Sequence, residues 1–247
     1  MTFDLVVATV GRTTELKRLF ASLEAQTHRE FRVLVVDQNA DDRIVPFLGP
    51  ALHLRSPLGL SHARNVALPH ITADAVAFPD DDCVYPPDLL ERVAALLENL
   101  DGVTGREPWW PAGAAMLTRD NLWNRSISFT IFLRRSVVER VGSFDETLGL
   151  PSRSGEETDY LIRALDAGAR IAYDPTLVIE HPQKPADLSE VGARDGASLG
   201  YILRKHRYPR STVTRMLVRP AGGVLLDPRR ARFHLATLRG RLRGYRS

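Results

Sequence analysis

The stretch "AVAFPDDDCVYPPDLL", residues 75–90, places three adjacent carboxylates directly after a short apolar run. An apolar run of this kind is typical of a buried strand, and Pro86 and Pro87 turn the chain after it. Neighbouring carboxylates repel one another, so they need either full solvation or a cation. The stretch is therefore either a solvated acidic turn or a cation site, and the sequence around it has to distinguish the two.

Strand and helix patterns alternate on the N-terminal side of this stretch. Residues 4–8 and 31–37 are β-branched runs, and residues 13–26 between them carry apolar side chains at helical spacing. Further strands are predicted at 51–56 and 73–80. This alternation predicts an α/β fold with a mostly parallel central sheet covered by helices.

The rest of the chain continues the mixed pattern. Helices are predicted at 87–100 and 155–168, a helix-compatible connector at 59–69, and a short helix followed by a turn at 135–149. Strands are predicted at 126–135 and, as two short pieces broken at Pro175, within 169–181; residues 106–115 are expected to form a surface loop. In the helix at 155–168, the predicted inward side chains are Tyr160, Leu161, Ala164 and Leu165.

Composition limits the class of protein. The 247 residues are 44% hydrophobic and 26% charged, which is ordinary for a folded globular chain. The single cysteine, Cys83, excludes an internal disulfide and is expected to be a buried filler in a reducing compartment. Asp4 interrupts the first apolar run, so we expect no secretory signal and a cytoplasmic location.

Charge is distributed unevenly. Residues 201–247 hold 13 Lys and Arg and one acid, a net charge of +12, which leaves −9 for the first 200 residues. We expect a main domain at 1–184 and a basic, mainly helical extension at 185–247. No nucleic-acid recognition motif is present, so residues 229–246 suggest a basic helix against an anionic membrane on the inner face of the plasma membrane. A helix packed on the domain is the alternative.

The carboxyl ends of parallel strands are where such sheets bind ligands. Asp37 and the acidic triplet Asp80–Asp82 both lie at the carboxyl ends of predicted strands. Clustered carboxylates suit Mg²⁺ or Mn²⁺. His181 also closes a strand and favours Mn²⁺ if it is a ligand, although a histidine before a proline is often a packed loop residue.

Several other charged residues have two interpretations. Arg12 and Arg64 are either phosphate-binding forks or exposed surface charges. Glu156 and Glu157 open a predicted helix, where they either complement its dipole or supply a general base. No glycine-rich phosphate loop of the dinucleotide or P-loop type occurs in the sequence, so a bound phosphate would need a metal and arginines.

In order along the chain, these motifs resemble the family 2 glycosyltransferases, which have the GT-A fold. The matching segments are "ATVGRTTELKRLFASLEAQT", "VLVVDQNADD", "GLSHARNVAL", "AVAFPDDDCVYPPDLL", "VGSFDETLG", "GEETDYLIRALDAGARIAYDP" and "VIEH". The resemblance implies transfer of a sugar from a nucleotide-diphosphate sugar to a saccharide or lipid-linked hydroxyl. It also implies a Mn²⁺ or Mg²⁺ cofactor and inversion of the anomeric centre, in the assembly of surface polysaccharide or glycoconjugate.

The resemblance also implies roles for individual residues. The nucleotide would be held by Thr9, Arg12, Asp37, Arg64, Asp80 and Asp81. Asp82 and His181 would hold the metal. Glu157 would be the catalytic base, in the place where an aspartate is usual, and Glu156 would be its neighbour. Helical spacing also puts Glu157 on the side of Tyr160 and Leu161, and Glu156 nearer the helix entrance.

Two other functions remain open from the sequence. A sugar-phosphate nucleotidyltransferase shares strand–helix alternation and carboxylate–metal chemistry, but it should carry a glycine-rich basic loop after the first strand. An inactive nucleotide- or carbohydrate-binding module would not need the acidic triplet, the glutamate pair and the histidine together. Release of pyrophosphate would indicate the former, and sugar transfer would exclude the latter.

Overall fold

The computed structural model describes residues 1–107, 109–150, 153–182 and 188–247. The chain forms two compact units. The first, here called the sheet unit, comprises Met1–Phe144 and Tyr160–Pro182, and the second, the helical unit, comprises Asp145–Asp159 and Gln183–Ser247.

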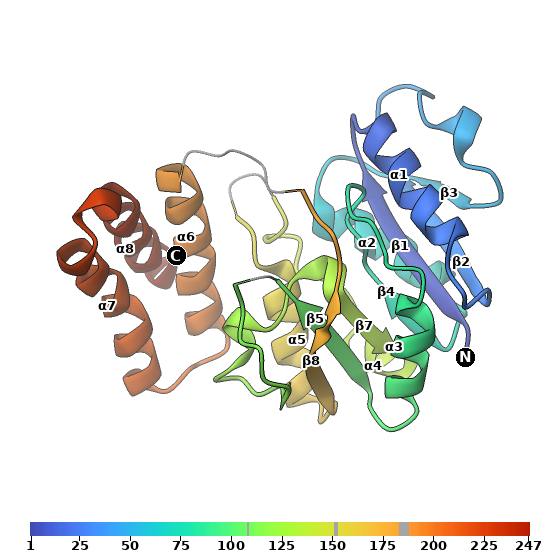
Figure 1. Ribbon diagram of the computed structural model, residues 1–247. Coiled ribbons are helices and arrows are strands. Elements are labelled where there is room, and N and C mark those ends of the chain that lie inside the picture. Colours follow the sequence, from blue (N-terminus) through green and yellow to red (C-terminus); the bar gives the residue numbers. More distant parts are fainter. Residues whose placement is uncertain (108, 151–152, 183–187) are drawn as a thin grey trace. The chain divides into compact units, whose positions relative to one another are not determined.

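The sheet unit is built on an eight-stranded sheet with the strand order β3-β2-β1-β4-β7-β5-β8-β6 (Figure 1). The strands are β1 (Phe3–Thr9), β2 (Phe31–Asp37), β3 (Leu52–Arg55), β4 (Ala75–Ala77), β5 (Gly102–Arg106), β6 (Ala115–Met116), β7 (Ile131–Arg134) and β8 (Ile171–Val178). Strands β1 to β4 are parallel, and β5 pairs with β8 in parallel, whereas β7 and β6 run antiparallel to their neighbours. The predicted α/β class with a mostly parallel sheet is confirmed.

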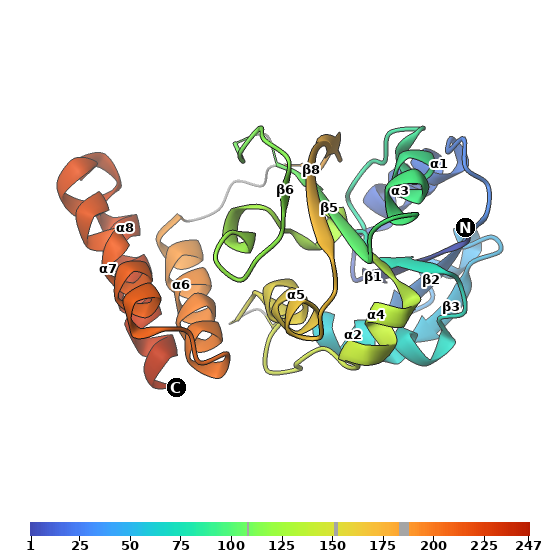
Figure 2. The same ribbon diagram turned by 90° about the horizontal axis from the view of Figure 1, so that it is seen from below.

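Helices cover both faces of this sheet (Figure 2). Helices α1 and α3 lie on one face, and α2, α4 and α5 on the other. The helices are α1 (Thr13–Glu24), α2 (Leu60–Ala67), α3 (Leu89–Leu97), α4 (Arg135–Val141) and α5 (Glu156–Asp166), with 3₁₀ turns at Val45–Phe47, Leu68–His70, Leu122–Asn124 and Ser128–Thr130. Helix α5 begins in the helical unit and continues into the sheet unit.

Strand β1 explains why the sheet needs two layers of helices. Phe3, Leu5 and Val7 alternate with Asp4 and Val6, and all five side chains are fully or almost fully buried. Because successive strand residues point to opposite faces, a strand with no exposed side must be covered twice. The odd-numbered side chains share one core with the leucines of α1 and α3.

Two strand predictions are wrong in detail. The stretch at 126–135 begins with a 3₁₀ turn over Ser128–Thr130 and becomes a strand only at Ile131. Residues 171–178 form one strand, not two pieces broken at Pro175. The register with β5 shifts between Thr104 and Arg106, so Pro175 lies at an irregularity where its missing N–H costs no ladder hydrogen bond.

The inward face of α5 also differs in part from the prediction. Tyr160, Leu161 and Ala164 are buried as predicted, but Ile162 is fully buried and Leu165 only half-buried. The buried side chains of α5 therefore cover a wider arc of the helix than the predicted stripe.

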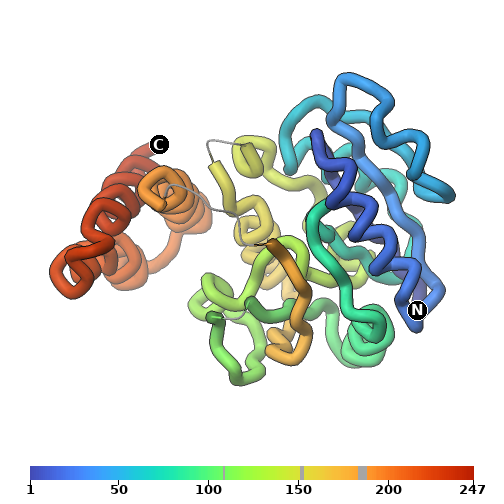
Figure 3. The backbone as a smooth tube through the Cα atoms, turned by 45° about the horizontal axis from the view of Figure 1, so that its top comes forward, coloured from blue at the N-terminus to red at the C-terminus, as the bar shows by residue number. Residues whose placement is uncertain are grey.

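The helical unit contains α6 (Leu188–Lys205), α7 (Arg210–Leu226), a 3₁₀ turn at Pro228–Arg230 and α8 (Ala231–Arg246). Helix α8 packs against both α6 and α7, and Figure 3 shows the three helices side by side. Glycines line the α6–α8 contact: Gly192, Gly196 and Gly200 on α6, and Gly240 and Gly244 on α8. A Cβ added at any of the five would overlap atoms of the opposite helix, so the two backbones approach more closely than larger side chains allow.

Within the described part of the chain, no helix is both long and apolar enough to cross a membrane.

Candidate active site

The acidic triplet follows β4, where the sheet ends. The Cys83 amide donates to the Asp80 carbonyl at 3.2 Å and closes the turn. Val84 and Glu180 form an isolated antiparallel bridge, with N–O distances of 2.8 and 3.2 Å. This bridge holds the segment after β8 beside the triplet, which is why His181, a hundred residues away in sequence, lies close to Asp82.

Asp80, Asp82 and His181 form a cluster suited to a metal ion. One ligand atom from each can be chosen so that all lie within 4.8 Å of one another. His181 Nε2 lies 3.1 Å from Asp82 Oδ1 and 3.7 Å from Asp80 Oδ2. Two carboxylates and an imidazole are the donor types that Mn²⁺ and Mg²⁺ accept, so the residues present fit a divalent cation.

Neighbouring side chains fix this cluster in place. The His181 ring stacks on Phe129 at a centroid distance of 4.6 Å and an interplanar angle of 5°. Ser128 Oγ donates to Asp80 Oδ1 at 3.1 Å. The 3₁₀ turn that replaced part of the predicted strand therefore supplies both supports.

Arg12 joins the other two carboxylates. Its Nη1 donates to Asp81 Oδ1 at 2.6 Å and to Asp82 Oδ2 at 2.9 Å. Thr9 Oγ1, at the end of β1, donates to Asp81 Oδ2 at 2.8 Å. In this structure Arg12 supplies positive charge to two carboxylates that would otherwise repel each other.

Burial of the triplet disfavours the ionised form of its carboxylates. Burial is the main cause that raises the pKa of Asp80, and Asp82 nearby adds to it, against the opposing effect of Arg64. Burial likewise raises the pKa of Asp81, although Thr9 and Arg12 oppose the shift. Anionic carboxylates in this position call for a compensating cation. The solvated-turn interpretation is wrong, since Asp81 and Asp82 are almost fully buried.

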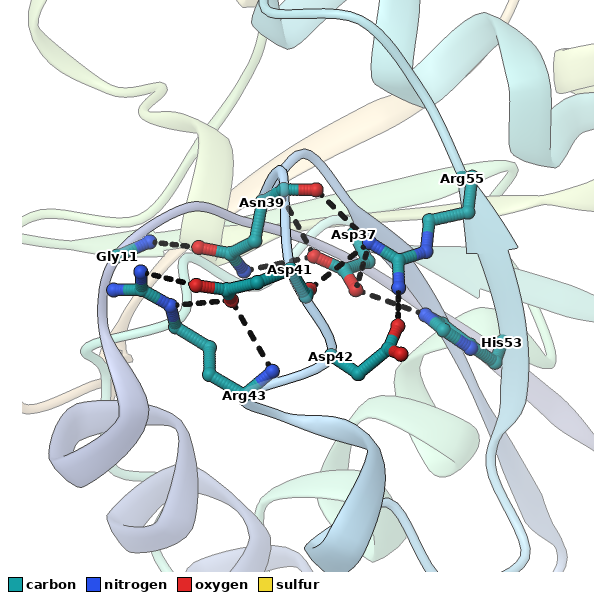
Figure 4. A network of polar contacts seen from close by, with 8 residues as sticks. All are labelled: Gly11, Asp37, Asn39, Asp41, Asp42, Arg43, His53 and Arg55. Atoms are coloured by element: carbon teal, nitrogen blue, oxygen red, sulfur yellow. Dashed lines mark hydrogen bonds and ion pairs between the residues drawn. The ribbon is translucent and has the colours of Figure 1, made fainter.

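Asp37, at the end of β2, organises a second polar network (Figure 4). Its Oδ1 accepts from the backbone N and the side-chain Nδ2 of Asn39 at 2.9 and 2.7 Å. His53 Nε2 and Arg55 Nη1 lie 3.0 and 3.2 Å from Oδ2. Burial opposes ionisation of Asp37, but the Asn39 and His53 hydrogen bonds outweigh it and hold its pKa below the ordinary value.

This network shapes the loop that follows β2. The Asn39 side chain also accepts from the Gly11 amide at 2.7 Å, which ties the loops after β1 and β2 together. Arg55 forms an ion pair with Asp42 and donates to the Asn39 carbonyl at 2.9 Å. The ends of β1 and β2 thus form one rigid polar rim.

Arg64 is not an exposed surface charge. On α2 it is 2% exposed, and its guanidinium lies 5.6 Å from the Phe78 ring centroid and 5.3 Å from that of Phe144. Its Nη2 is 4.0 Å from Asp80 Oδ1. A buried arginine aimed at the triplet is placed to meet an anion there.

Glu156 and Glu157 begin α5 in the helical unit. Glu156 is 4% exposed and Glu157 is half-buried, so burial does not single out Glu157 as the inward residue. The reason is that Glu156 stands four residues before Tyr160 and therefore shares its face of the helix.

The start of α5 is anchored by α6. Lys205 Nζ lies 2.6 Å from both Asp159 Oδ1 and Asp145 Oδ2, and His206 Nε2 lies 2.8 Å from Asp159 Oδ1. Tyr201 donates to Asp145 at 3.1 Å. The turn at residue 145 and the helix that bears the glutamates are thus held by the end of one C-terminal helix.

Some contributors to the site were missed from the sequence. Asn39, His53, Arg55, Ser128 and Phe129 support the predicted residues directly. Asn39 could have been found, because an aspartate at a strand end can accept from the backbone N–H two residues on in an Asx turn, and Asn39 holds that position. Phe129 and Ser128 carry no such signal, since only the fold brings them to the triplet. Cys83 is buried, and burial raises the pKa of its thiol well above the ordinary value, in agreement with a filler role.

Comparison with known proteins identifies the family. The profile described as "Glycosyl transferase family 2" matches residues 4–140, more than half of the chain. The chain belongs to glycosyl transferase family 2. The predicted resemblance is therefore confirmed, and the matched residues include the ends of β1 and β2, Arg64 and the triplet, but neither the glutamate pair nor His181.

Relatives of this family 2 chain agree with that assignment. The pre-mycofactocin glycosyltransferase of Mycobacterium tuberculosis is 28% identical over 212 residues, covering 73% of this chain and 42% of the relative. This chain thus spans under half of that protein's length. The succinoglycan biosynthesis protein ExoM of Rhizobium meliloti is 26% identical over 247 residues, covering 90% of this chain and 77% of ExoM.

Solved structures share the GT-A fold. The mannosyltransferase PcManGT of Pyrobaculum calidifontis, in complex with GDP-Man and Mn²⁺, superposes with a TM-score of 0.71 at 16% identity, covering 98% of this chain and 86% of that one. S. aureus TarS 1–349, in complex with UDP-GlcNAc, gives 0.61 at 19% identity, covering 100% and 92%.

Proposed function

We propose that this protein transfers a sugar from a nucleotide-diphosphate sugar to an acceptor hydroxyl, with inversion and with a divalent cation. The observation that carries the proposal is the convergence of Asp80, Asp82 and His181 at the ends of two strands of the sheet unit. Family membership supports the reaction class. The GDP-Man and Mn²⁺ of PcManGT and the UDP-GlcNAc of TarS support the donor class.

Asp82 and His181 would hold the cation, with Asp80 beside them. A divalent cation bound there supplies positive charge to the diphosphate leaving group as the sugar–phosphate bond breaks. Because His181 is stacked on Phe129, its imidazole needs little reordering to serve as a ligand.

The arginines and the polar rim would receive the nucleotide. Arg64 is buried and directed at Asp80, so it is placed to meet a phosphate without losing further side-chain freedom. Arg12 now pairs with Asp81 and Asp82, and we propose that it exchanges these carboxylates for phosphate oxygens when cation and donor bind. Thr9 and the Asp37 network would contact base and ribose.

Glu157 would take the proton from the acceptor hydroxyl as that oxygen attacks the anomeric carbon. Attack from the face opposite the leaving diphosphate inverts the configuration, and no covalent sugar–enzyme intermediate is formed. Glu156 would position the acceptor or cap the helix. By analogy with ExoM, the acceptor would belong to a growing surface polysaccharide or glycoconjugate, either a saccharide or a lipid-linked sugar.

A thermal-shift panel tests the donor and the cation together. We expect one of UDP, GDP and dTDP to raise the melting temperature in Mn²⁺ or Mg²⁺, and the shift to vanish in chelator, because a ligand that binds only the folded state stabilises by mass action. Asp82→Asn is the matched variant. Without ligands it should melt at the wild-type temperature, but the cation-dependent shift should be lost. No shift with any nucleotide diphosphate in either metal would overturn the proposal. Pyrophosphate release from a nucleotide triphosphate and a sugar phosphate would indicate a nucleotidyltransferase instead.

A further inference from the structure

The turn between α7 and α8 exposes two large apolar side chains. Leu225 is 81% exposed and Leu226 is 88% exposed, the highest values among the exposed large hydrophobic residues of the described chain. Both lie at the C-terminal end of α7, where the hairpin turns into the Pro228–Arg230 segment (Figure 1). Exposed leucines in adjacent positions are unusual on a protein that meets only water.

These leucines belong to one face of α7. Val218, Gly222 and Leu225 follow the i, i+4, i+7 spacing, and Leu226 continues it at i+8, so all four share one side of the helix. Val218 is 52% exposed, and Gly222 has no atom near its missing Cβ. The C-terminal half of α7 thus presents apolar side chains at Val218, Leu225 and Leu226 that the described residues of the helical unit leave largely exposed.

The opposite side of α7 is already used for packing within the unit. The His234 ring of α8 lies directly over Gly223, and Arg241 of α8 donates to the Met216 carbonyl. Because α8 packs on this side of α7, Leu225 and Leu226 on the other side point away from α8.

Arginines surround this apolar strip. Arg215 and Arg219 lie on the same face of α7, three and seven residues before members of the strip, and Arg229, Arg230 and Arg232 follow the turn; all five are exposed. Asp227 is the single acid in residues 201–247, and its carboxylate lies 4.0 Å from Arg230 Nε. The tip of the hairpin is thus apolar at its centre and cationic at its rim. We call residues 215–232 the hairpin tip.

We propose that the hairpin tip docks on an anionic lipid surface, with Leu225 and Leu226 entering the boundary between headgroups and acyl chains and the arginines contacting lipid phosphates. An amphipathic surface with arginines beside leucines has the two components that such binding needs, apolar insertion and attraction to negative headgroups. A nucleic acid would use the arginines but leave the leucines in water. A second copy would bring two strongly basic segments together.

The proposal relocates the membrane contact expected from residues 229–246. In α8, Phe233 lies against Gly192 and Leu238 is half-buried, while Leu235 and Leu242 are each only 39% exposed. Most of the apolar side chains of α8 therefore pack within the helical unit, and the hairpin tip exposes the larger apolar surface. This inference does not depend on the proposed function.

Vesicle flotation tests it with the full chain. Wild-type protein should float with vesicles of phosphatidylcholine mixed with phosphatidylglycerol and remain behind with pure phosphatidylcholine. The double variant Leu225→Ser/Leu226→Ser should bind the anionic vesicles at least ~10-fold more weakly, because the apolar insertion is lost. Leu58→Ser is the matched control, since Leu58 is 71% exposed but lies in the sheet unit, and it should bind as wild type does.

A second variant separates charge from insertion. Arg229→Gln/Arg230→Gln/Arg232→Gln should lose about fivefold in affinity for anionic vesicles for each arginine, which reduces the preference for anionic over neutral vesicles. All the changed side chains are exposed, so the melting temperatures should match wild type and confirm intact folding.

Three results would overturn the proposal. One is equal binding of wild type to neutral and anionic vesicles. The second is unchanged binding by the leucine variant. The third is a concentration-dependent dimer that the leucine variant abolishes, which would make the hairpin tip a contact between copies of the chain.

Discussion

The sheet unit and the helical unit differ in the kind of internal packing that stabilises each of them. In the sheet unit, large apolar side chains fill the space between layers: Phe3, Leu5 and Val7 of β1 meet the leucines of α1 and α3. In the helical unit, α6 and α8 meet where side chains are missing, at glycines such as Gly200 and Gly244. One unit is stabilised by what its residues bury, the other by how closely its backbones approach.

The difference matters for function, because the two units carry different parts of the proposed chemistry. The sheet unit holds the triplet, His181 and the polar rim around Asp37. The helical unit holds Glu156 and Glu157 at the start of α5, anchored through Asp159 to Lys205 and His206. Donor and cation would thus be the task of the sheet unit, and the acceptor's proton that of the helical unit.

Replacing the proposed base should have the largest effect, because it should separate donor binding from sugar transfer. We expect Glu157→Gln to keep nucleotide and metal binding near normal while cutting transfer by at least the ~10²-fold typical of losing a general base. Steady-state kinetics with a defined donor, together with nucleotide binding by thermal shift, measure both. Glu156→Gln is the control at the adjacent position and should cost less, unless it positions the acceptor.

The product reports on the same residue independently. NMR of the glycoside should show an anomeric configuration opposite to that of the donor. Retention of configuration, or near-native turnover by Glu157→Gln, would show that Glu157 is not an inverting base.

The close helix contact predicts a large loss of stability from a single methyl group. A Cβ at Gly244 would overlap the Ala197 carbonyl oxygen, so Gly244→Ala should destabilise the helical unit by about 3 kcal/mol, the upper part of the usual range for overpacking. Gly222→Ala adds the same methyl group in α7, where nothing lies within 4 Å, and should be neutral or stabilising by about 0.5–1 kcal/mol. Equal melting temperatures for the two variants would contradict the close backbone contact.

Acid should weaken the sheet unit through Asp4. This buried carboxylate accepts from Arg32 at 2.7 and 2.9 Å and from the amides of Thr72 and Ala73. Burial opposes its ionisation, but these hydrogen bonds outweigh the burial and hold its pKa below the ordinary value. A depressed folded-state pKa stabilises fully above the unfolded value of about 3.9 and is lost as the pH falls through the folded value.

We therefore expect Asp4→Asn to cost about 1.5–3 kcal/mol at pH 7, the usual contribution of hydrogen bonds to a charged group. The difference from wild type should shrink as the pH falls below 4. Urea unfolding at several pH values measures it, and a difference that does not change with pH would show that Asp4 is not held as a carboxylate.

The contrast between the units also explains what the sequence could predict. Apolar periodicity located β1, α1, β2 and α5, because side chains that fill a core recur at the period of the element. Irregularities escaped it: Pro175 is tolerated inside β8 by a register shift in its partner, and the turn at Ser128–Thr130 has strand-like composition. The glycine contact of α6 and α8 was not predicted, since small residues leave no apolar signal.

For the site, order along the chain was enough to place the strand-end residues. Asp37 is the last residue of β2, the triplet follows β4 and His181 follows β8, and such strand ends meet at one edge of a parallel sheet. Supporting side chains were not predictable in this way, because the stacking of Phe129 on His181 depends on the fold alone. Glu156 and Glu157 differ by one helical step, and the choice between them remains a prediction.

Donor cleavage by the Asp82→Asn variant tests the central claim most directly. The measurement is release of nucleotide diphosphate from sugar donors that carry the nucleotide identified by thermal shift, for wild type and variant, with Mn²⁺ or with chelator. We expect wild type to release it only with the cation and Asp82→Asn to lose at least ~10²-fold in rate while melting as wild type does, because the leaving group then lacks its compensating charge. Full activity of Asp82→Asn in chelator would contradict the claim that Asp80, Asp82 and His181 form the cation site of a sugar transferase.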